Sequence, residues 1–115
     1  MIQGDIYLFR VPYSDGSGSK PRPVLIISGH HANKGQDVVV VPISSNTDRS
    51  DDFTILVEDT WDHFGDTGLD ETSRINWSKP ITVSKASLKS LKPRLGYLHA
   101  ELLQEVKTKF NTLTS

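Results

Sequence analysis

The chain has 115 residues, a formal net charge of −1 and no cysteine. A chain of this length builds one hydrophobic core, so residues 1–115 are predicted to form a single domain. The lack of cysteine excludes disulfide frameworks, thiolate metal sites and a cysteine nucleophile. The N-terminus has no signal-peptide pattern and no apolar run is long enough to span a bilayer, so we expect a cytosolic (cytoplasmic) protein without a membrane segment.

Charge is distributed unevenly along the sequence. Residues 48–71 hold nine acidic side chains against Arg49, a local net charge of −8, whereas residues 72–115 hold eight basic side chains against two acidic ones, a local net charge of +6. Local fields rather than total charge steer charged ligands, so this asymmetry suggests a basic face. Random clustering on a solvated surface accounts for the same numbers, and both interpretations stay open.

Short strands with turn-forming residues between them account for most of the sequence. Two of them are continuous apolar runs typical of buried strands, and Pro42 is expected to end the second run because it has no N–H to donate. A single helical turn is plausible within residues 58–66. The predicted strands cover residues 5–11, 23–28, 38–43, 53–57, 73–77 and 81–84.

The hydrophobic period changes near the C-terminal end. Apolar residues recur there every three or four positions, which predicts an amphipathic helix that begins near His99, although no residue of good N-cap type stands there. Five to seven short strands and one terminal helix are typical of a small SH3-like barrel with the helix closing one end. The apolar stripe of the helix consists of Leu98, Leu102, Val106, Phe110 and Leu113.

The stretch SDGSGSKPRPVLIIS, residues 14–28, leads into the first buried run through two prolines. Pro21 and Pro23 restrict themselves and the residues before them, Lys20 and Arg22, to extended backbone. Arg22 is therefore expected to be held stiffly in a loop at the mouth of the strand, where its forked guanidinium matches a phosphate. An ordinary surface arginine beside a turn is the alternative.

Two serines, Ser44 and Ser45, follow the second buried run. The connection between the two runs is too short for a helical crossover, so the strands are expected to be antiparallel neighbours. Antiparallel pairing brings the end of the second run to the start of the first, and so brings Ser44 close to Arg22. Alone, a serine pair at the end of a strand is a common turn former.

Several segments together carry a resemblance to a known family. Gly4-Asp5-Ile6, the glycine–serine stretch before Lys20-x-Arg22-Pro23, and Val41-Pro42-Ile43-Ser44 look like the N-terminal half of the MazF/PemK family of toxin endoribonucleases. The later TGLDETSRINWSKPITV, LGYL and the terminal helix are similar to the rest of the family layout. The resemblance implies a mainly β, SH3-like barrel with a C-terminal helix that forms a homodimer and is neutralised by a cognate antitoxin. It also implies cleavage of single-stranded RNA with no metal and no other cofactor.

The resemblance assigns catalytic roles to Arg22 and Ser44. It implies that a ribose 2′-hydroxyl attacks its own phosphodiester and leaves a 2′,3′-cyclic phosphate and a 5′-hydroxyl. Arg22 would stabilise the phosphorane, and Ser44 would hydrogen-bond a phosphate oxygen or the attacking hydroxyl. The residues expected to contact RNA are Ser19, Lys20, Ser45, Asn76, Trp77 and Ser78.

Two positions depart from the pattern of some family members. Gly16 stands where those members carry a histidine, and Asn76-Trp77-Ser78 stand where they carry Arg-x-Asp. These departures leave no obvious general base. The Trp77 ring is expected either to stack on an unpaired base or, as is more common for tryptophan, to pack in the core.

Three alternative functions stay open from the sequence. A non-enzymatic SH3-like module would need an exposed aromatic groove, which the sequence does not reveal. A gyrase poison of the same fold would end in a tryptophan-containing tail, whereas this chain ends in FNTLTS. An inactive relative that binds the antitoxin has no distinguishing residue.

The adjacent His30 and His31 point to opposite sides of an extended chain and are not expected to share a metal, and His63 is expected to cap a helix rather than to catalyse.

Overall fold

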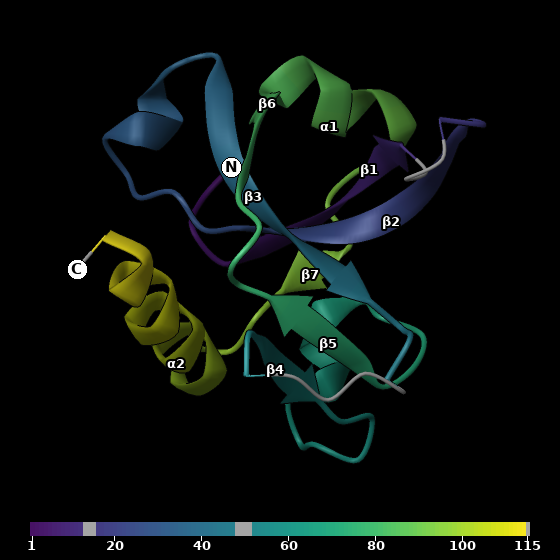
Figure 1. Cartoon of the computed structure of the whole chain (residues 1–115), viewed down its shortest axis with the longest axis vertical. Coiled ribbons are helices and arrows are strands. Elements are labelled where there is room, and N and C mark those ends of the chain that lie inside the picture. The colour runs from purple at the N-terminus through teal and green to yellow at the C-terminus, as the bar shows by residue number, and fades with distance from the viewer. Residues whose placement is uncertain (13–15, 48–51, 115) are drawn as a thin grey trace.

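Seven strands and two α-helices make up the part of the chain that the computed structural model describes, which is residues 1–12, 16–47 and 52–114. The strands follow the order β4-β5-β3-β2-β1-β7 in one curled sheet, and β6 pairs with β3 beside this path (Figure 1). The strands are β1 (Asp5–Pro12), β2 (Ser19–Ile26), β3 (Asp37–Ser44), β4 (Thr54–Val57), β5 (Ser73–Asn76), β6 (Ile81–Ser84) and β7 (Gly96–Tyr97). The helices are α1 (Lys85–Leu91) and α2 (Ala100–Asn111), and short 3₁₀ turns lie at Ala32–Lys34, Phe64–Thr67 and Thr112–Thr114.

The predicted class, a mainly β curled barrel with a C-terminal helix, is confirmed, and every predicted strand occurs. The helical turn expected within residues 58–66 is the 3₁₀ turn Phe64–Thr67. The sequence missed α1 and β7 because seven and two residues are too short for a period to be recognised. The sequence does hold one signal for α1, which is the N-cap residue Ser84. Its hydroxyl accepts a hydrogen bond from the Ser87 N–H at 3.1 Å.

Strand β3 is the centre of the sheet. It pairs with β2 along one edge and with β6 and then β5 along the other, always antiparallel. Pro42 does not end this strand, contrary to the sequence prediction. The pairing with β6 stops at Val40 and the pairing with β5 starts at Ile43, so no neighbour on that edge requires an N–H donor from Pro42.

The two faces of β3 support two separate hydrophobic clusters. Val41 and Ile43 belong to one cluster, which α2 covers with Val106, whereas Val38 and Val40 belong to the other, where Leu88 of α1 is also buried. The two helices accordingly lie on different sides of the sheet (Figure 1). Successive side chains of a strand point to opposite faces, which accounts for this division.

Strand β2 begins earlier than the sequence predicted, so Lys20 and Arg22 lie in a strand and not in a loop. Arg22 stands opposite Phe9 of β1. Strand β3 pairs only with residues 24–26 of β2, which leaves the other edge of residues 19–23 without a strand partner. Pro21 and Pro23 are tolerated there because an unpaired edge requires no N–H donor. The stiffness expected for Arg22 therefore comes from pairing with β1 as well as from the prolines.

Helix α2 begins at Ala100 and has an N-cap that the sequence analysis did not identify. The His99 Nδ1 atom accepts a hydrogen bond from the Glu101 N–H at 3.3 Å. An imidazole nitrogen thus replaces the usual serine, threonine or aspartate oxygen at this position.

The buried carboxylate of Asp5 connects the start of β1 to the segment before β7. It accepts hydrogen bonds from the Ile2 N–H at 3.0 Å and from Arg94 Nη1 at 3.1 Å, and it is only 4% exposed. Burial and, next, the charge of Asp5 raise the pKa of the Tyr7 phenol, while Arg94 lowers it. Because the overall shift of the pKa is upward, the Tyr7 phenol stays protonated near pH 7 and is not a candidate base there.

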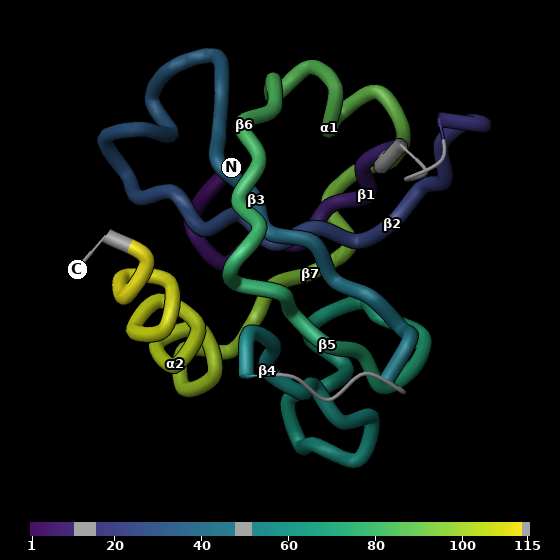
Figure 2. Tube along the Cα trace, viewed as in Figure 1, coloured from purple at the N-terminus to yellow at the C-terminus, as the bar shows by residue number. Residues whose placement is uncertain are grey.

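The connection between β4 and β5, drawn in teal, lies at the opposite end of the molecule from α1 (Figure 2). Its backbone packs directly against β7. A Cβ atom placed on Gly96 would lie 2.2 Å from the Asp66 carbonyl oxygen, and one placed on Gly68 would lie 2.2 Å from the Leu95 carbonyl oxygen. Gly68 also has φ of +72°, a backbone conformation that favours glycine. Only glycine allows this approach.

We expect Gly96→Ala to destabilise the protein by about 2 kcal/mol, because the new methyl group collides with backbone that has no rotamer through which to escape. Urea unfolding followed by circular dichroism measures the change. Gly65→Ala is the matched control, since a Cβ atom at Gly65 meets nothing within 4 Å. Equal stability of the two variants would show that the approach of β7 to this connection is not tight.

Candidate functional site

Two cavities flank the C-terminal end of β3. The first, here called the inner cavity, has a volume of about 340 Å³ and lies on the face of β3 that carries Ile43. The second, the outer cavity, has a volume of about 370 Å³ and lies where Ser44 points. The polar residues that line the inner cavity are Lys20, Arg22, Ser45, Asp70, Glu71, Ser73 and Lys92. Those that line the outer cavity, together with Phe53, are Ser44, Asn46, Thr54, Arg74, Asn76, Ser78 and Lys79.

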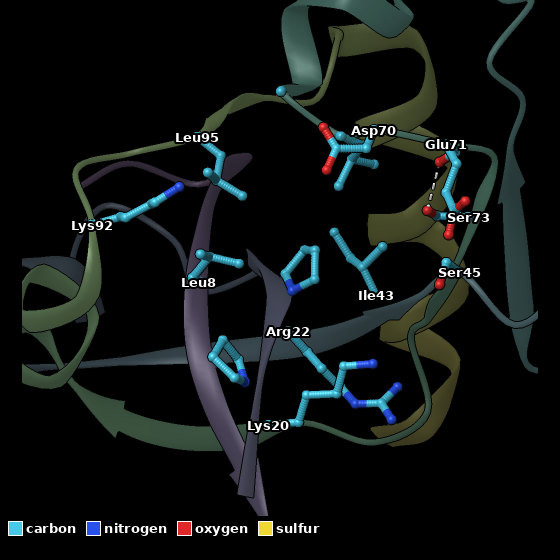
Figure 3. Close-up of a pocket in the computed structure, with 14 residues that line it drawn as sticks. Leu8, Lys20, Arg22, Ile43, Ser45, Asp70, Glu71, Ser73, Lys92 and Leu95 are labelled. Carbon is cyan, nitrogen blue, oxygen red and sulfur yellow. Dashed lines mark hydrogen bonds between the residues drawn. The ribbon is translucent and has the colours of Figure 1, made fainter.

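The inner cavity separates charges of opposite sign. Lys20 and Arg22 extend from β2 along one side, and Asp70 and Glu71 lie on the opposite side (Figure 3). Arg22 is half-buried and lies on a paired strand, so its guanidinium is held more firmly than one on a loop. The cationic side can hold a phosphate group, since a guanidinium donates two parallel hydrogen bonds to such an anion.

The acidic side of the inner cavity carries groups that can accept a proton. Ser73 donates a hydrogen bond from its hydroxyl to the Glu71 carbonyl oxygen at 2.8 Å, which fixes the backbone of this wall (Figure 3). The close approach at Gly68 holds the same segment against Leu95, another residue of the cavity. Cations that bind a phosphodiester and carboxylates that accept a proton are the groups that acid–base cleavage requires.

The outer cavity is built from the ends of β3, β4 and β5. Ser44 stands opposite Arg74 in the sheet, and Thr54 stands opposite Asn76. Arg74 donates from Nη1 to the Thr54 hydroxyl at 3.2 Å, whereas its buried Nε has no hydrogen-bond partner among the residues that the structure describes. Phe53 is an exposed aromatic residue at this site.

The structure does not place the two predicted catalytic residues in one cavity. Arg22 lines the inner cavity and Ser44 lines the outer one, because neighbouring positions of β3 point to opposite faces. Ser45 lies with Arg22 instead, as does Lys20. Ser19 begins β2, is exposed, and lies outside the lining of both cavities.

The predicted RNA-contacting triplet is divided in the same way. Asn76 and Ser78 line the outer cavity, whereas Trp77 is 5% exposed and belongs to the hydrophobic core. The Trp77 ring is thus almost fully buried and packs against Phe53, with centroids 5.7 Å apart. The core position, which the sequence offered as the more common alternative, is the one found.

The sequence analysis missed several residues of the two cavities. Arg74 alternates with Asn76 along β5, so the period of two already placed both side chains on one face. Phe53 falls within the predicted strand 53–57, but it lies just before β4 and is 52% exposed. Asp70 and Glu71 were interpreted only as part of a solvated acidic segment.

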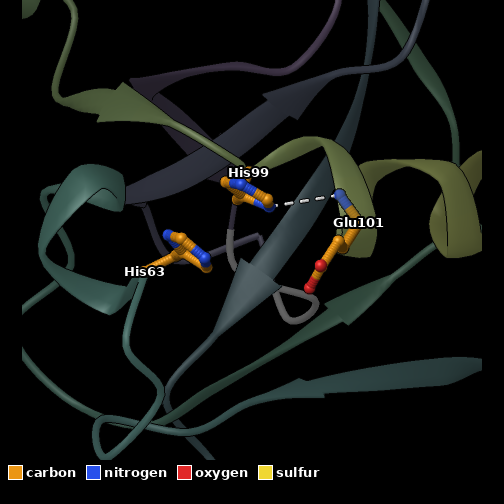
Figure 4. A group of neighbouring side chains, drawn as sticks. All are labelled: His63, His99 and Glu101. Atoms are coloured by element: carbon orange, nitrogen blue, oxygen red, sulfur yellow. Dashed lines mark hydrogen bonds between the residues drawn. The ribbon is translucent and has the colours of Figure 1, made fainter.

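A further group of neighbouring side chains lies near the start of α2. Ligand atoms of His63, His99 and Glu101 all lie within 4.8 Å of one another (Figure 4). The two imidazole rings are stacked, with centroids 3.6 Å apart and planes 11° apart. The nitrogen lone pairs lie in the ring planes, so nearly parallel rings do not converge on one ion. The His63 side chain makes no capping hydrogen bond; His99 caps a helix instead.

The sequence and fold were compared with those of known proteins. Residues 2–114 match the family described as PemK-like, MazF-like toxin of type II toxin-antitoxin system. A search of curated proteins finds no match to this chain. No helix among the described residues has the length and apolar character that crossing a membrane requires.

Solved structures share the fold at low sequence identity. An endoribonuclease in complex with its cognate antitoxin from Mycobacterial species is 20% identical with a TM-score of 0.74, over 99% of this chain and 94% of that one. The Mycobacterium tuberculosis toxin MazF-mt6 is 21% identical with a TM-score of 0.68, over 96% of each chain. A MazE-MazF structure from Deinococcus radiodurans is 16% identical with a TM-score of 0.70, over 100% of this chain and 95% of that one. The chain described here belongs to the PemK-like, MazF-like toxin family of type II toxin-antitoxin systems.

Proposed function

We propose that this protein is an endoribonuclease toxin that cleaves single-stranded RNA without a metal ion. The observation that carries the proposal is the position of Arg22, half-buried on a paired strand and directed along a cavity that also contains carboxylates. Membership of the toxin family supports it, as does the structural likeness to an endoribonuclease.

The proposed reaction is an internal transfer at phosphorus. The ribose 2′-hydroxyl attacks the adjacent phosphorus atom while the bond from phosphorus to the 5′-oxygen breaks, which leaves a 2′,3′-cyclic phosphate and a 5′-hydroxyl. The Arg22 guanidinium stabilises the negative charge that builds on the equatorial oxygens. The 2′-hydroxyl proton passes to a base, and the departing 5′-oxygen takes a proton from water to become the 5′-hydroxyl.

The carboxylates of the inner cavity are the candidates for that base. Asn76-Trp77-Ser78 offer no carboxylate, and a serine hydroxyl is a poor base near neutral pH. Asp70 and Glu71 line the same cavity as Arg22, so we assign the proton to one of these two residues. The proposal thus names a candidate for the general base that the sequence analysis did not identify.

Arg22→Ala is expected to lower the cleavage rate at least about a hundredfold, the scale seen when one preorganised donor to a developing charge is lost. Arg22→Lys should recover only part of the rate, because an ammonium cannot reproduce the planar fork. The measurement is single-turnover cleavage of a labelled RNA in the presence of a chelator, with circular dichroism to verify folding.

Arg10→Ala is the matched control for this experiment. Arg10 is an exposed arginine on β1 that lines neither cavity, and its removal should leave the rate unchanged. If Arg22→Ala cuts as fast as the wild type, or if the wild type does not cut RNA, the catalytic assignment is wrong.

Ser44→Ala is expected to lower the rate about tenfold, less than Arg22→Ala does, and Ser44→Thr should be tolerated because it keeps the hydroxyl. The Ser44 Oγ atom accepts the Asn46 N–H at 3.2 Å, so its own proton is still available to donate. Ser45→Ala, measured in the same assay, tests the hydroxyl that shares the cavity of Arg22. If Ser45→Ala lowers the cleavage rate more than Ser44→Ala does, Ser45 and not Ser44 is the serine that hydrogen-bonds the reacting group.

We also infer that the chain forms a homodimer and that a peptide-like antitoxin with acidic and apolar residues covers its active-site face. Structures similar to this one are complexes of a toxin with its antitoxin, and the cations Lys20 and Arg22 of the inner cavity favour a partner with acidic residues. Sedimentation should give twice the mass of the chain at micromolar concentration.

Expression of the chain alone should stop growth, and the product of a neighbouring gene should restore it. A monomer at high concentration, or no rescue by any neighbouring gene, would contradict this assembly.

A further inference from the structure

Apart from Ser44, the outer cavity has no role in the cleavage step proposed above, yet it combines an exposed aromatic ring with several hydrogen-bond donors. Phe53 is 52% exposed, and its ring leans on the buried Trp77 with centroids 5.7 Å apart and planes tilted by 55°. Trp77 thus supports Phe53 from the core side. A supported and exposed aromatic ring offers the flat surface on which an unpaired base stacks.

Arg74 lies half-buried in the same cavity with unused donor capacity. Its Nη1 atom donates to Thr54, and its Nε atom is buried without a partner among the described residues. A buried donor without an acceptor is uncommon in a folded protein, so a ligand that draws the Arg74 side chain toward the cavity gives Nε the acceptor that it lacks. Nε lies on the guanidinium edge away from Nη1, so that edge can serve two neighbouring acceptors at once.

Three other residues of the outer cavity, Asn76, Ser44 and Lys79, also offer hydrogen-bond donors. The Asn76 Oδ1 atom already accepts from the Ser78 N–H at 3.0 Å and from the Ser78 hydroxyl at 2.7 Å, which leaves the Asn76 amide NH₂ as its donor. Ser44 keeps a hydroxyl proton, and Lys79 adds an exposed ammonium. No carboxylate occurs among the described residues that line this cavity. Such a cavity selects a ligand that presents acceptors.

We propose that the outer cavity binds a guanine base of the RNA, stacked on Phe53 and read by Arg74. Guanine presents two adjacent acceptors, O6 and N7, to which an arginine donates a bidentate pair of hydrogen bonds, whereas adenine and cytosine place an amino donor at the corresponding edge. Stacking on Phe53 contributes affinity for any base, and the hydrogen bonds from Arg74 select guanine over the other bases. The proposal rests on the proposed function, because it takes the ligand to be single-stranded RNA.

The position of the outer cavity relative to the inner one fits a single RNA strand. Ser44 and Ser45 are consecutive residues and line different cavities. A strand that crosses the end of β3 can therefore place a phosphate beside Arg22 and the base of a neighbouring nucleotide on Phe53. Cleavage would then occur close to a guanine.

Binding of short fluorescent 2′-O-methyl RNAs tests the proposal without any cleavage. The oligonucleotides carry a single guanine, adenine or 7-deazaguanine in a uridine background, and fluorescence anisotropy reports the affinity. The wild type should bind the guanine oligonucleotide at least about tenfold more tightly than either of the others, because each of those lacks part of the bidentate pair. Equal affinity for all three, or no binding to any, overturns the proposal.

Variants separate the two roles within the site. Arg74→Lys keeps the positive charge but should abolish the preference for guanine, and 7-deazaguanine should then cause no further loss. Phe53→Ala should weaken binding to all three oligonucleotides by a similar factor of about ten, and Phe53→Trp should restore it. Lys79→Ala is the control for simple charge, and it should reduce the salt dependence of binding without changing the preference.

The remaining outcomes also decide the matter. If Arg74→Ala weakens binding to all three oligonucleotides equally and Phe53→Ala has no effect, the cavity holds a phosphate and the base assignment is wrong. If the wild type cuts unmodified RNA with no preference near guanine, the proposed function stands and this inference fails. If it binds the guanine oligonucleotide as described but cuts no RNA, the inference stands and the proposed function fails.

Discussion

The alternation of side chains along β3 is the constraint on which the rest of the structure depends. Because this strand pairs with β2, β5 and β6, neither of its edges can slip without breaking another pairing. One face of β3 completes the core under α2 and the other completes the core under α1. At the end of the strand the same alternation directs Ile43 to the inner cavity and Ser44 to the outer one. Core packing therefore fixes the geometry of the site.

The inner cavity illustrates how a small barrel can bring opposite charges together. Two of its cations, Lys20 and Arg22, come from β2, which is an early part of the chain, whereas its carboxylates come from the connection between β4 and β5. The glycine contacts with β7 hold that connection in place. The acidic segment next to a basic one in the sequence is thus more than a solvated surface, since two of its members face Arg22 across a cavity that suits a phosphate.

Much of the fold could be predicted from the sequence, because apolar runs and the alternation of apolar and polar residues indicate which residues are buried. The antiparallel pairing of β2 with β3 followed from a short connection, and the terminal helix followed from its apolar stripe. Pro42 misled the prediction because a proline is excluded only where a neighbour requires its N–H, and the sequence does not reveal that β3 changes partner there. The histidine cap of α2 was hidden because imidazole is rarely a capping group.

The candidate site was predicted less completely. Arg22 and Lys20 were found through the prolines beside them. Which residues share a cavity with Ser44 or with Ser45 depends on strand register, and register cannot be predicted from one segment alone. Phe53 and Arg74 gave no signal alone, since an aromatic residue before a strand and an arginine within one are ordinary features. Only the pairing of β4 with β5 brings them to one cavity.

The central claim is that RNA crosses the end of β3, with a phosphate in the inner cavity and a base in the outer one. A crystal structure of the protein with a guanine-containing RNA whose attacking hydroxyl is replaced by hydrogen tests this claim most directly. The account predicts the scissile phosphate within hydrogen-bond distance of Arg22 and a guanine stacked on Phe53 with its O6 and N7 facing Arg74. An RNA bound across another face, with both cavities empty, would contradict it.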